Sequence, residues 1–219
     1  MKLKRGKLAR IVNDLRYLLD QGYPRDSAVD FVSNHYRLPL HERHLIARCV
    51  FSKQEVVEHR QKIVRAGKVR GKSLGIDGYN VVITLESILT GKQVVCCDDG
   101  FVRDLRAIFG KYKASSATKR AIEEVLKAVA KARPSKVAVF FDKQVSRSGE
   151  LAGNVRHGLR ELGLKGDSRA VGGVDFRLRG FDVVASSDRA VINWAKAVWD
   201  IPAELLRRKK ANVLDLTEF

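Results

Sequence analysis

Cysteine is scarce in this sequence. Its 219 residues include three cysteines, Cys49, Cys96 and Cys97. Two adjacent cysteines do not easily form a disulfide with each other, and the chain has no Cys-x-x-Cys pair. A disulfide framework and a zinc knuckle are therefore not indicated, and a reducing cytoplasm is the compartment that we expect.

Three other features are missing. No apolar stretch approaches the roughly twenty residues that a membrane helix needs, so we expect no membrane partner. Neither glycine-rich phosphate loop, G-x-x-x-x-G-K-[ST] or G-x-G-x-x-G, is found after a strand, which disfavours a nucleotide sensor. No histidine or cysteine nucleophile is well placed, so the sequence gives no support to a covalent mechanism.

Acidic residues are outnumbered: 25 Asp and Glu stand against 42 Lys and Arg, which gives a formal net charge of +17. So large a basic excess is typical of proteins that bind a polyanion, usually nucleic acid. The alternative is a heat-adapted or simply soluble surface rich in lysine. Composition does not distinguish RNA from DNA.

The first third of the chain reads as helices. Apolar residues recur at helical spacing in the first of them: Leu8, Ile11, Val12, Leu15, Leu18 and Leu19. Ser52 and Glu55 form a capping-box pattern that predicts a fourth helix over residues 53–65. Residues 1–70 hold sixteen Lys or Arg against seven Asp or Glu, a net of nine positive charges. A helix-turn-helix and a plain helical bundle both fit this pattern.

The glycine-flanked basic segment 67–72 is the best candidate for a domain boundary. We therefore expect a basic all-helical domain over residues 1–66, a linker over 67–72 and an α/β domain over 73–219. The helical part also holds His35, His41, His44 and His59, none at a recognised metal-ligand spacing with cysteine. We interpret these four as surface or phosphate-contacting histidines.

Three apolar runs in the second part each end on an aspartate. Leu74 and Ile76 lead to Asp77, residues 136–141 lead to Asp142, and residues 181–187 lead to Asp188. A helix predicted over residues 118–133 separates the first two runs, as in a βαβ unit with parallel strands. We therefore expect a three-layer α/β/α fold with a mainly parallel sheet, and three carboxylates at one sheet edge.

Three strand ends carry a resemblance to a known family. Asp77-Gly78-Tyr79-Asn80, Phe140-Phe141-Asp142 and Ser186-Ser187-Asp188 follow one another as in the PIN-like nucleases, within them the NYN branch. The resemblance covers about residues 70–219. It implies a PIN-like, Rossmann-like fold and a metal-dependent ribonuclease. With the helical segment attached, the chain also resembles an archaeal family of uncharacterised proteins, which implies no activity.

The resemblance also implies the site residues. Asp77, Asp142 and Asp188 would hold Mg²⁺ or Mn²⁺, because three close carboxylates cannot all stay ionised without a cation. The bound cation would assist phosphodiester hydrolysis, and Asn80 would orient a ligand. The family often carries a second acidic residue where this chain has Ala190. The metal site would then be one ligand short, or the missing ligand would come from elsewhere, with Glu86, Asp99 and Asp104 as candidates.

Cations and hydroxyls near the expected site are candidates for contacting nucleic acid. They are Lys72, Lys111, Lys113, Arg147, Ser148 and Arg189. The leading hypothesis is a Mg²⁺- or Mn²⁺-dependent endoribonuclease of RNA processing or decay, in a monomer or a homodimer. The alternatives are a non-catalytic RNA- or ribosome-binding protein on the same fold, and a DNA-binding regulator that uses the helical domain.

Overall fold

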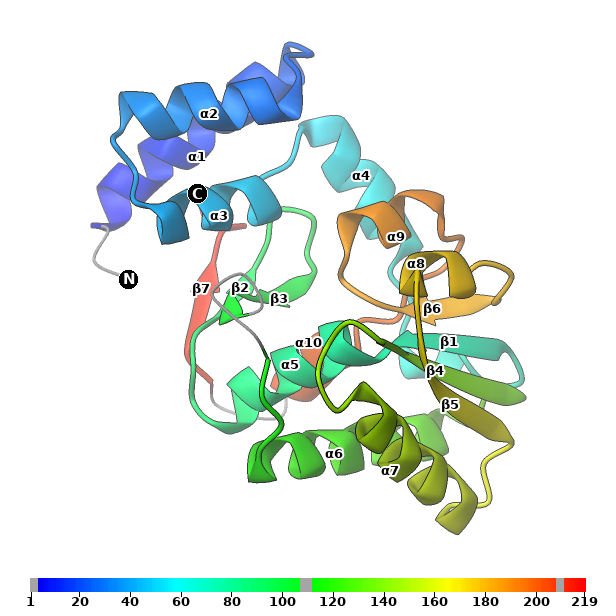
Figure 1. Ribbon diagram of the computed structural model, residues 1–219. Coiled ribbons are helices and arrows are strands. Elements are labelled where there is room, and N and C mark those ends of the chain that lie inside the picture. The colour runs from blue at the N-terminus through cyan, green and yellow to red at the C-terminus, as the bar shows by residue number, and fades with distance from the viewer. Residues whose placement is uncertain (1–3, 107–111, 208–210) are drawn as a thin grey trace.

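The structure is a computed structural model that describes residues 4–106, 112–207 and 211–219. Four helices come first and strands alternate with helices afterwards (Figure 1). The helices of the first part are α1 (Arg5–Asp20), α2 (Arg25–His35), α3 (Leu40–Cys49), α4 (Lys53–Lys62) and the 3₁₀ turn η1 (Ala66–Lys68). Ser52 caps α4 and closes the predicted capping box with Glu55.

The main sheet has four strands in the order β5-β4-β1-β6, and all of its pairs are parallel. The strands are β1 (Ser73–Asp77), β4 (Lys136–Asp142), β5 (Gly166–Val171) and β6 (Val183–Ala185). The chain moves outward from β1 to β4 and β5, and then returns to place β6 on the other side of β1. Ligands of open α/β sheets bind at such a reversal, outside the carboxyl ends of the strands.

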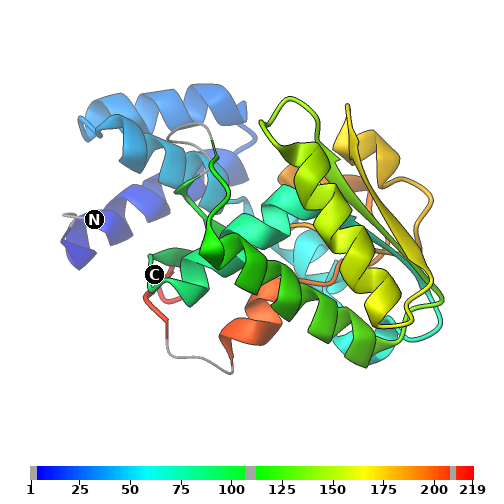
Figure 2. The same cartoon turned by 60° about the horizontal axis from the view of Figure 1, so that its bottom comes forward.

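Helices cover both faces of this sheet, which confirms the Rossmann-like three-layer α/β fold. One face packs on α5 (Gly78–Leu89), α6 (Ser116–Ala132) and α7 (Ser148–Glu161) in the largest apolar core. The other face packs on α8 (Val174–Arg177) and α9 (Arg189–Trp194), around Val184 and Ile192. Figure 2 shows α6 and α7 side by side, with α5 beside α6. The helix α10 (Ile201–Leu206) contacts α5.

A second, smaller sheet joins the helical part to the rest. It has the order β3-β2-β7, with β2 (Val94–Cys96), β3 (Val102–Asp104) and β7 (Val213–Asp215). Val95, Cys97 and Leu216 from this region share one apolar core with α1, α2 and α3. Because the two parts share this core, the boundary at residues 67–72 stays a prediction. No helix in the described ranges is long and apolar enough to span a membrane.

Two parts of the structure were not expected from the sequence. Asp104 ends strand β3, because Asp98, Asp99 and Gly100 form the turn of the β2–β3 hairpin. The strand β5 was not anticipated, because its alternating burial and charged residues hide the apolar signal of an edge strand. The last strand, β7, lies in the small sheet and pairs with β2.

Gly78 is a position where a side chain does not fit. A Cβ atom there would lie 2.5 Å from a ring carbon of Phe141, a residue with no exposed surface. We expect Gly78→Ala to lower the free energy of unfolding by about 1–3 kcal/mol, the usual cost of overpacking. Gly153→Ala on α7 is the control: its Cβ meets nothing within 4 Å. Urea unfolding of both variants tests this, and equal stability of Gly78→Ala and the wild type would contradict it.

Candidate active site

The three strand-ending aspartates lie at one edge of the main sheet. Asp77 ends β1, Asp142 ends β4, and Asp188 follows β6 and caps α9. Since β4, β1 and β6 are neighbouring parallel strands, their carboxyl ends point the same way. All three aspartates line one cleft of about 650 Å³. The structure thus brings together residues that are 111 positions apart in the sequence.

Each of these carboxylates also organises its own loop. One oxygen of each accepts a hydrogen bond from a backbone N–H two or three residues further on, at 3.2 Å for Asp77, 2.9 Å for Asp142 and 2.7 Å for Asp188. This capping geometry is what aspartate favours at a helix start or turn. The second oxygen of Asp77 accepts the hydroxyl of Ser186 at 3.3 Å. The second oxygens of Asp142 and Asp188 have no hydrogen bond within the described residues.

Asp77 has a perturbed pKa. Burial raises the pKa of its carboxyl to about 7, and the negative charges of Asp188 and Asp142 add to the shift. The backbone N–H of Asn80 and the Ser186 hydroxyl act in the opposite direction. Near neutral pH, Asp77 therefore exchanges between its neutral and ionised forms, and a cation among these carboxylates would favour the ionised one.

Two further aspartates line the same cleft. Asp104 comes from the end of β3, and Asp175 comes from α8. Ala190 lines it too. Oxygen donors of this kind suit Mg²⁺ or Mn²⁺. Within residues 4–106, 112–207 and 211–219, however, no three Asp, Glu, His or Cys side chains are close enough together to hold a metal ion as they stand. The cleft contains oxygen donors that suit these cations, but the donors do not form a complete metal site as they stand.

Glu86 and Asp99 are not available as extra ligands. Glu86 is buried and accepts hydrogen bonds from Thr118, Tyr112 and Arg106. Asp99 is fully buried among cationic side chains behind the cleft. Neither lines the cleft, and each is held by its own hydrogen-bond and ion-pair partners. Of the extra ligand candidates, only Asp104 reaches the cleft.

Two of the expected nucleic-acid contacts do not line the cleft, and their contact with nucleic acid stays a prediction. Lys72 precedes β1, so it lies at the opposite edge of the sheet from the carboxylates. Ser148 begins α7 and is 6% exposed, which leaves little of it for a phosphate to contact.

The other candidate cations that the structure describes lie outside the cleft lining. Arg147 is exposed and forms an ion pair with Glu150 at 2.9 Å. Arg189 forms one with Glu55 at 2.8 Å. Lys113 is exposed ahead of α6, and Lys111 falls outside the described residues. Contacts between these cations and nucleic acid stay predictions.

Residues 66–204, which include the whole main sheet, match a family described as "Domain of unknown function (DUF5616)". The chain belongs to this family. Residues 7–62 match a second description, "Protein of unknown function (DUF434)". An uncharacterized protein of Methanocaldococcus jannaschii, MJ0935, is 35% identical over 199 residues, which are 90% of this chain and 95% of that protein. No solved structure matches the chain significantly.

Within the DUF5616 region, Asn80 fixes the turn that carries Asp188. Its side-chain oxygen accepts the backbone N–H of Ser187 at 2.7 Å and the Ser187 hydroxyl at 3.0 Å. The side-chain oxygen of Asn80 therefore ties β6 to the start of α5. This is a positioning contact, and it differs from the expected role of orienting a ligand, which stays untested.

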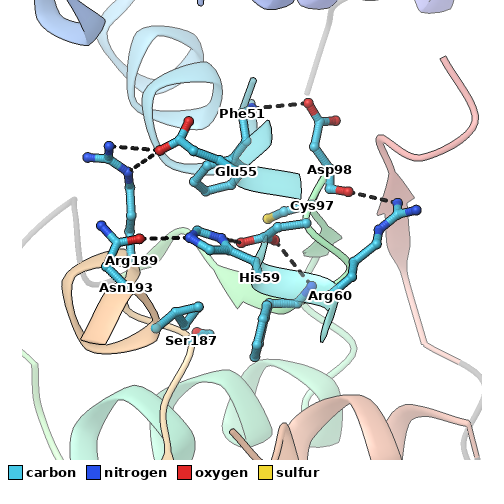
Figure 3. A network of polar contacts seen from close by, with 12 residues as sticks. Phe51, Glu55, His59, Arg60, Cys97, Asp98, Ser187, Arg189 and Asn193 are labelled. Atoms are coloured by element: carbon cyan, nitrogen blue, oxygen red, sulfur yellow. Dashed lines mark hydrogen bonds and ion pairs between the residues drawn. The ribbon is translucent and has the colours of Figure 1, made fainter. Parts of the chain in front are cut away.

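A buried ionic network lies behind this turn (Figure 3). The carboxylate of Asp99 accepts two hydrogen bonds from Arg103, at 2.7 and 2.6 Å, and lies 2.9 Å from Nδ1 of His59. All three side chains are at most 2% exposed. Burial alone would raise the pKa of Asp99, but Arg103 and His59 lower it to about 2. The Asp99 carboxylate is therefore ionised, and it compensates the buried charge of Arg103.

The network reaches α9 from two sides. Arg103 donates from Nε to the backbone carbonyl of Ser187 at 2.7 Å, one residue before Asp188. Nε2 of His59 lies 2.8 Å from the side-chain oxygen of Asn193, at the other end of α9. The helical part thus fixes, through α4, the short helix that Asp188 caps. The expectation that His59 is a surface histidine was wrong, because it fills a buried position between α4 and α9.

Sequence reasoning missed two residues of the cleft. Arg48 lines it from α3, yet nothing in the sequence distinguishes Arg48 from the other basic residues around it. Asp175 lines the cleft from α8 and was not among the predicted site residues. Its position next to Gly172 and Gly173, directly after the end of β5, was the signal that could have placed it at this sheet edge.

Proposed function

We propose that this protein is a Mg²⁺- or Mn²⁺-dependent endoribonuclease of the PIN-like, NYN type that acts in RNA processing or decay. One observation carries the proposal: three aspartates from the ends of three neighbouring parallel strands line a single cleft. They do so in a chain with a net charge of +17. A strongly basic protein that brings five of its 25 acidic residues to one cleft is suited to a polyanionic substrate and a cation.

The chemistry follows from the donors. Asp77, Asp142 and Asp188 would hold the cation, with Asp104 as the nearest candidate for the position of Ala190. When bound, Mg²⁺ or Mn²⁺ would polarise the scissile phosphate and lower the pKa of a water molecule. Asn80 and Ser186 would keep Asp188 and Asp77 in place through the hydrogen bonds described above. No covalent intermediate on the protein is required.

The cleavage assay tests this directly. Purified protein is incubated with a fluorescein-labelled single-stranded RNA, and with DNA of the same sequence, in Mn²⁺, in Mg²⁺ or in EDTA. We expect cleavage of the RNA with either metal and none in EDTA. Tight RNA binding without cleavage under any metal would contradict the proposal. A preference for one duplex DNA sequence with a steep salt dependence would instead favour a regulator that uses the helical part.

A non-catalytic RNA- or ribosome-binding protein is the second candidate. Ala190 favours it: an apolar methyl group lines the cleft where the resembling nucleases often carry an acid. The cleft would then have no catalytic role, and the basic surface alone would bind the RNA. The cytoplasm remains the proposed compartment, since all three cysteines are free thiols, and a homodimer stays a prediction.

Metal binding should also stabilise the fold. Because the cation would bind only the folded chain, we expect Mn²⁺ at about 100 times its Kd to add about 2.7 kcal/mol to the free energy of unfolding. Thermal melts with and without Mn²⁺ measure this as a rise in Tm that EDTA reverses. Asp188→Asn should lose the rise, while Asp26→Asn, an exposed residue of α2, should keep it. A rise of equal size in both variants would place the metal elsewhere.

A further inference from the structure

We propose that Arg48, from the helical part of the chain, binds the phosphate group of the RNA in the cleft. The helical part would then be a component of the active site and not only a neighbouring domain. The identity of the ligand as RNA rests on the proposed function. The placement of a phosphate-binding arginine rests on the contacts of the described residues.

Arg48 is the one cation in the cleft lining formed by the described residues. It lies in the last turn of α3 and faces a lining that includes five aspartates, those of the three strand ends together with Asp104 and Asp175. An anionic substrate entering this lining meets mostly negative charge. A bound metal ion would offset part of that repulsion, and a guanidinium in the same lining would offset more of it.

The guanidinium of Arg48 has spare donors. In the described part of the chain it makes one hydrogen bond, from Nη1 to the backbone carbonyl of Asp104 at 3.4 Å, and no ion pair. Arg103, Arg106 and Arg189 nearby are each paired with a carboxylate at 2.6–2.8 Å. An arginine carries five N–H donors in a fork that matches phosphate oxygens. Arg48 is therefore chemically free to bind an anion where its neighbours are not.

The position of Arg48 is held from both sides of α3. The carboxylate of Asp98 accepts the backbone N–H of Phe51 at 3.1 Å and forms an ion pair with Arg16 on α1 at 2.6 Å. Arg60 on α4 donates to the backbone carbonyl of Asp98 at 2.8 Å. Figure 3 shows the contacts of Phe51 and Arg60 with Asp98, beside the network of His59. These bonds fix the end of α3 to the β2–β3 turn, and so fix Arg48 relative to the carboxylates.

This arrangement gives a physical reason for the two family regions to occur in one chain. The residues that match DUF434 supply Arg48, and the residues that match DUF5616 supply the carboxylates. The cleft is complete only when both are docked. A phosphodiester bound there would have a cation on the carboxylate side and the guanidinium on the other.

The experiment compares Arg48→Met with Arg10→Met, which removes the same charge from an exposed site on α1. Affinity for a fluorescein-labelled single-stranded RNA is measured by anisotropy in EDTA, and cleavage is measured in Mn²⁺. We expect Arg48→Met to weaken binding about ten-fold or more and to lower kcat/KM further, while Arg10→Met stays near the wild type. Arg48→Lys should recover part of the loss, because it keeps the charge without the fork.

Two readouts separate this role from a structural one. The affinity of Arg48→Met for Mn²⁺ alone should equal or exceed that of the wild type, because removing the guanidinium removes repulsion toward the metal. Its Tm should stay near that of the wild type, because Arg48 makes one hydrogen bond of 3.4 Å and no ion pair among the described residues. If Arg48→Met and Arg10→Met bind and cleave RNA equally, the inference is overturned while the proposed function stands. If Arg48→Met binds RNA more weakly but the wild type never cleaves it, the proposed function fails and the role of Arg48 stands.

Discussion

Replacing Asp77 with asparagine is expected to lower metal-dependent RNA cleavage about a thousand-fold or more. Asp77 ends the central strand β1 and has neighbours at both sides of it, Asp142 on β4 and Asp188 after β6. The loss of the negative charge of Asp77 would lower the affinity for the cation and would reduce the stabilisation of the transition state. A loss of about 4 kcal/mol corresponds to three powers of ten in rate.

The same variant should fold well. Asparagine caps a helix nearly as well as aspartate, so the bond to the backbone N–H of Asn80 is kept. Because burial and like charges disfavour the ionised form of Asp77, we expect the Tm of metal-free Asp77→Asn to equal or exceed that of the wild type. Rates measured in Mn²⁺, with Asp26→Asn as the control, test the prediction. A folded Asp77→Asn that cleaves RNA at the wild-type rate would contradict it.

Replacing Asp99 with asparagine is expected to lower the free energy of unfolding by about 3–5 kcal/mol. The variant leaves the guanidinium of Arg103 buried without a carboxylate and breaks the contact with His59. Removing one partner of a buried ion pair is costly because the remaining charge keeps its desolvation penalty. Asp167→Asn is the control, since its ion pair with Arg169 is exposed and should contribute at most about 1 kcal/mol.

The effect of Asp99 should depend on pH in a defined direction. The pKa of Asp99 is lowered from 3.8 to about 2 in the folded protein. A depressed pKa contributes stability above the unfolded value and loses it as pH falls through the folded one. The difference between the wild type and Asp99→Asn, measured by urea unfolding, should therefore be constant above about pH 4 and shrink toward pH 2. A difference that grows below pH 4 would refute the assigned ion pair.

The main sheet could be predicted because its signals are local. The strands β1 and β4 are apolar runs that end on an aspartate, and Asp188 follows the apolar strand β6. Parallel strands bring these ends to one edge. The direction of β1 also places Lys72 at the sheet edge opposite the carboxylates, and this could have been predicted from the sequence. The small sheet was harder to predict, because its strands have three residues each and β7 pairs with β2 across more than a hundred positions.

The residues that reach the cleft or its surroundings from outside the main sheet could not be predicted in the same way. Arg48 and Arg43 lie on one helix, but only the packing of α3 against the small sheet brings Arg48 to the cleft. His59 and Asp99 are ordinary polar residues in the sequence, and their burial depends on contacts made 40 positions apart. Polar networks of this kind have no periodicity, so composition and spacing do not indicate them.

The most direct test is the position of a Mn²⁺ ion in crystals soaked with the metal, measured by anomalous diffraction. The account predicts a peak in the cleft, bounded by the carboxylates of Asp77, Asp142 and Asp188, and its loss in Asp77→Asn. A peak at another site, or a cleft that takes up no Mn²⁺ while the protein still cleaves RNA, would contradict it.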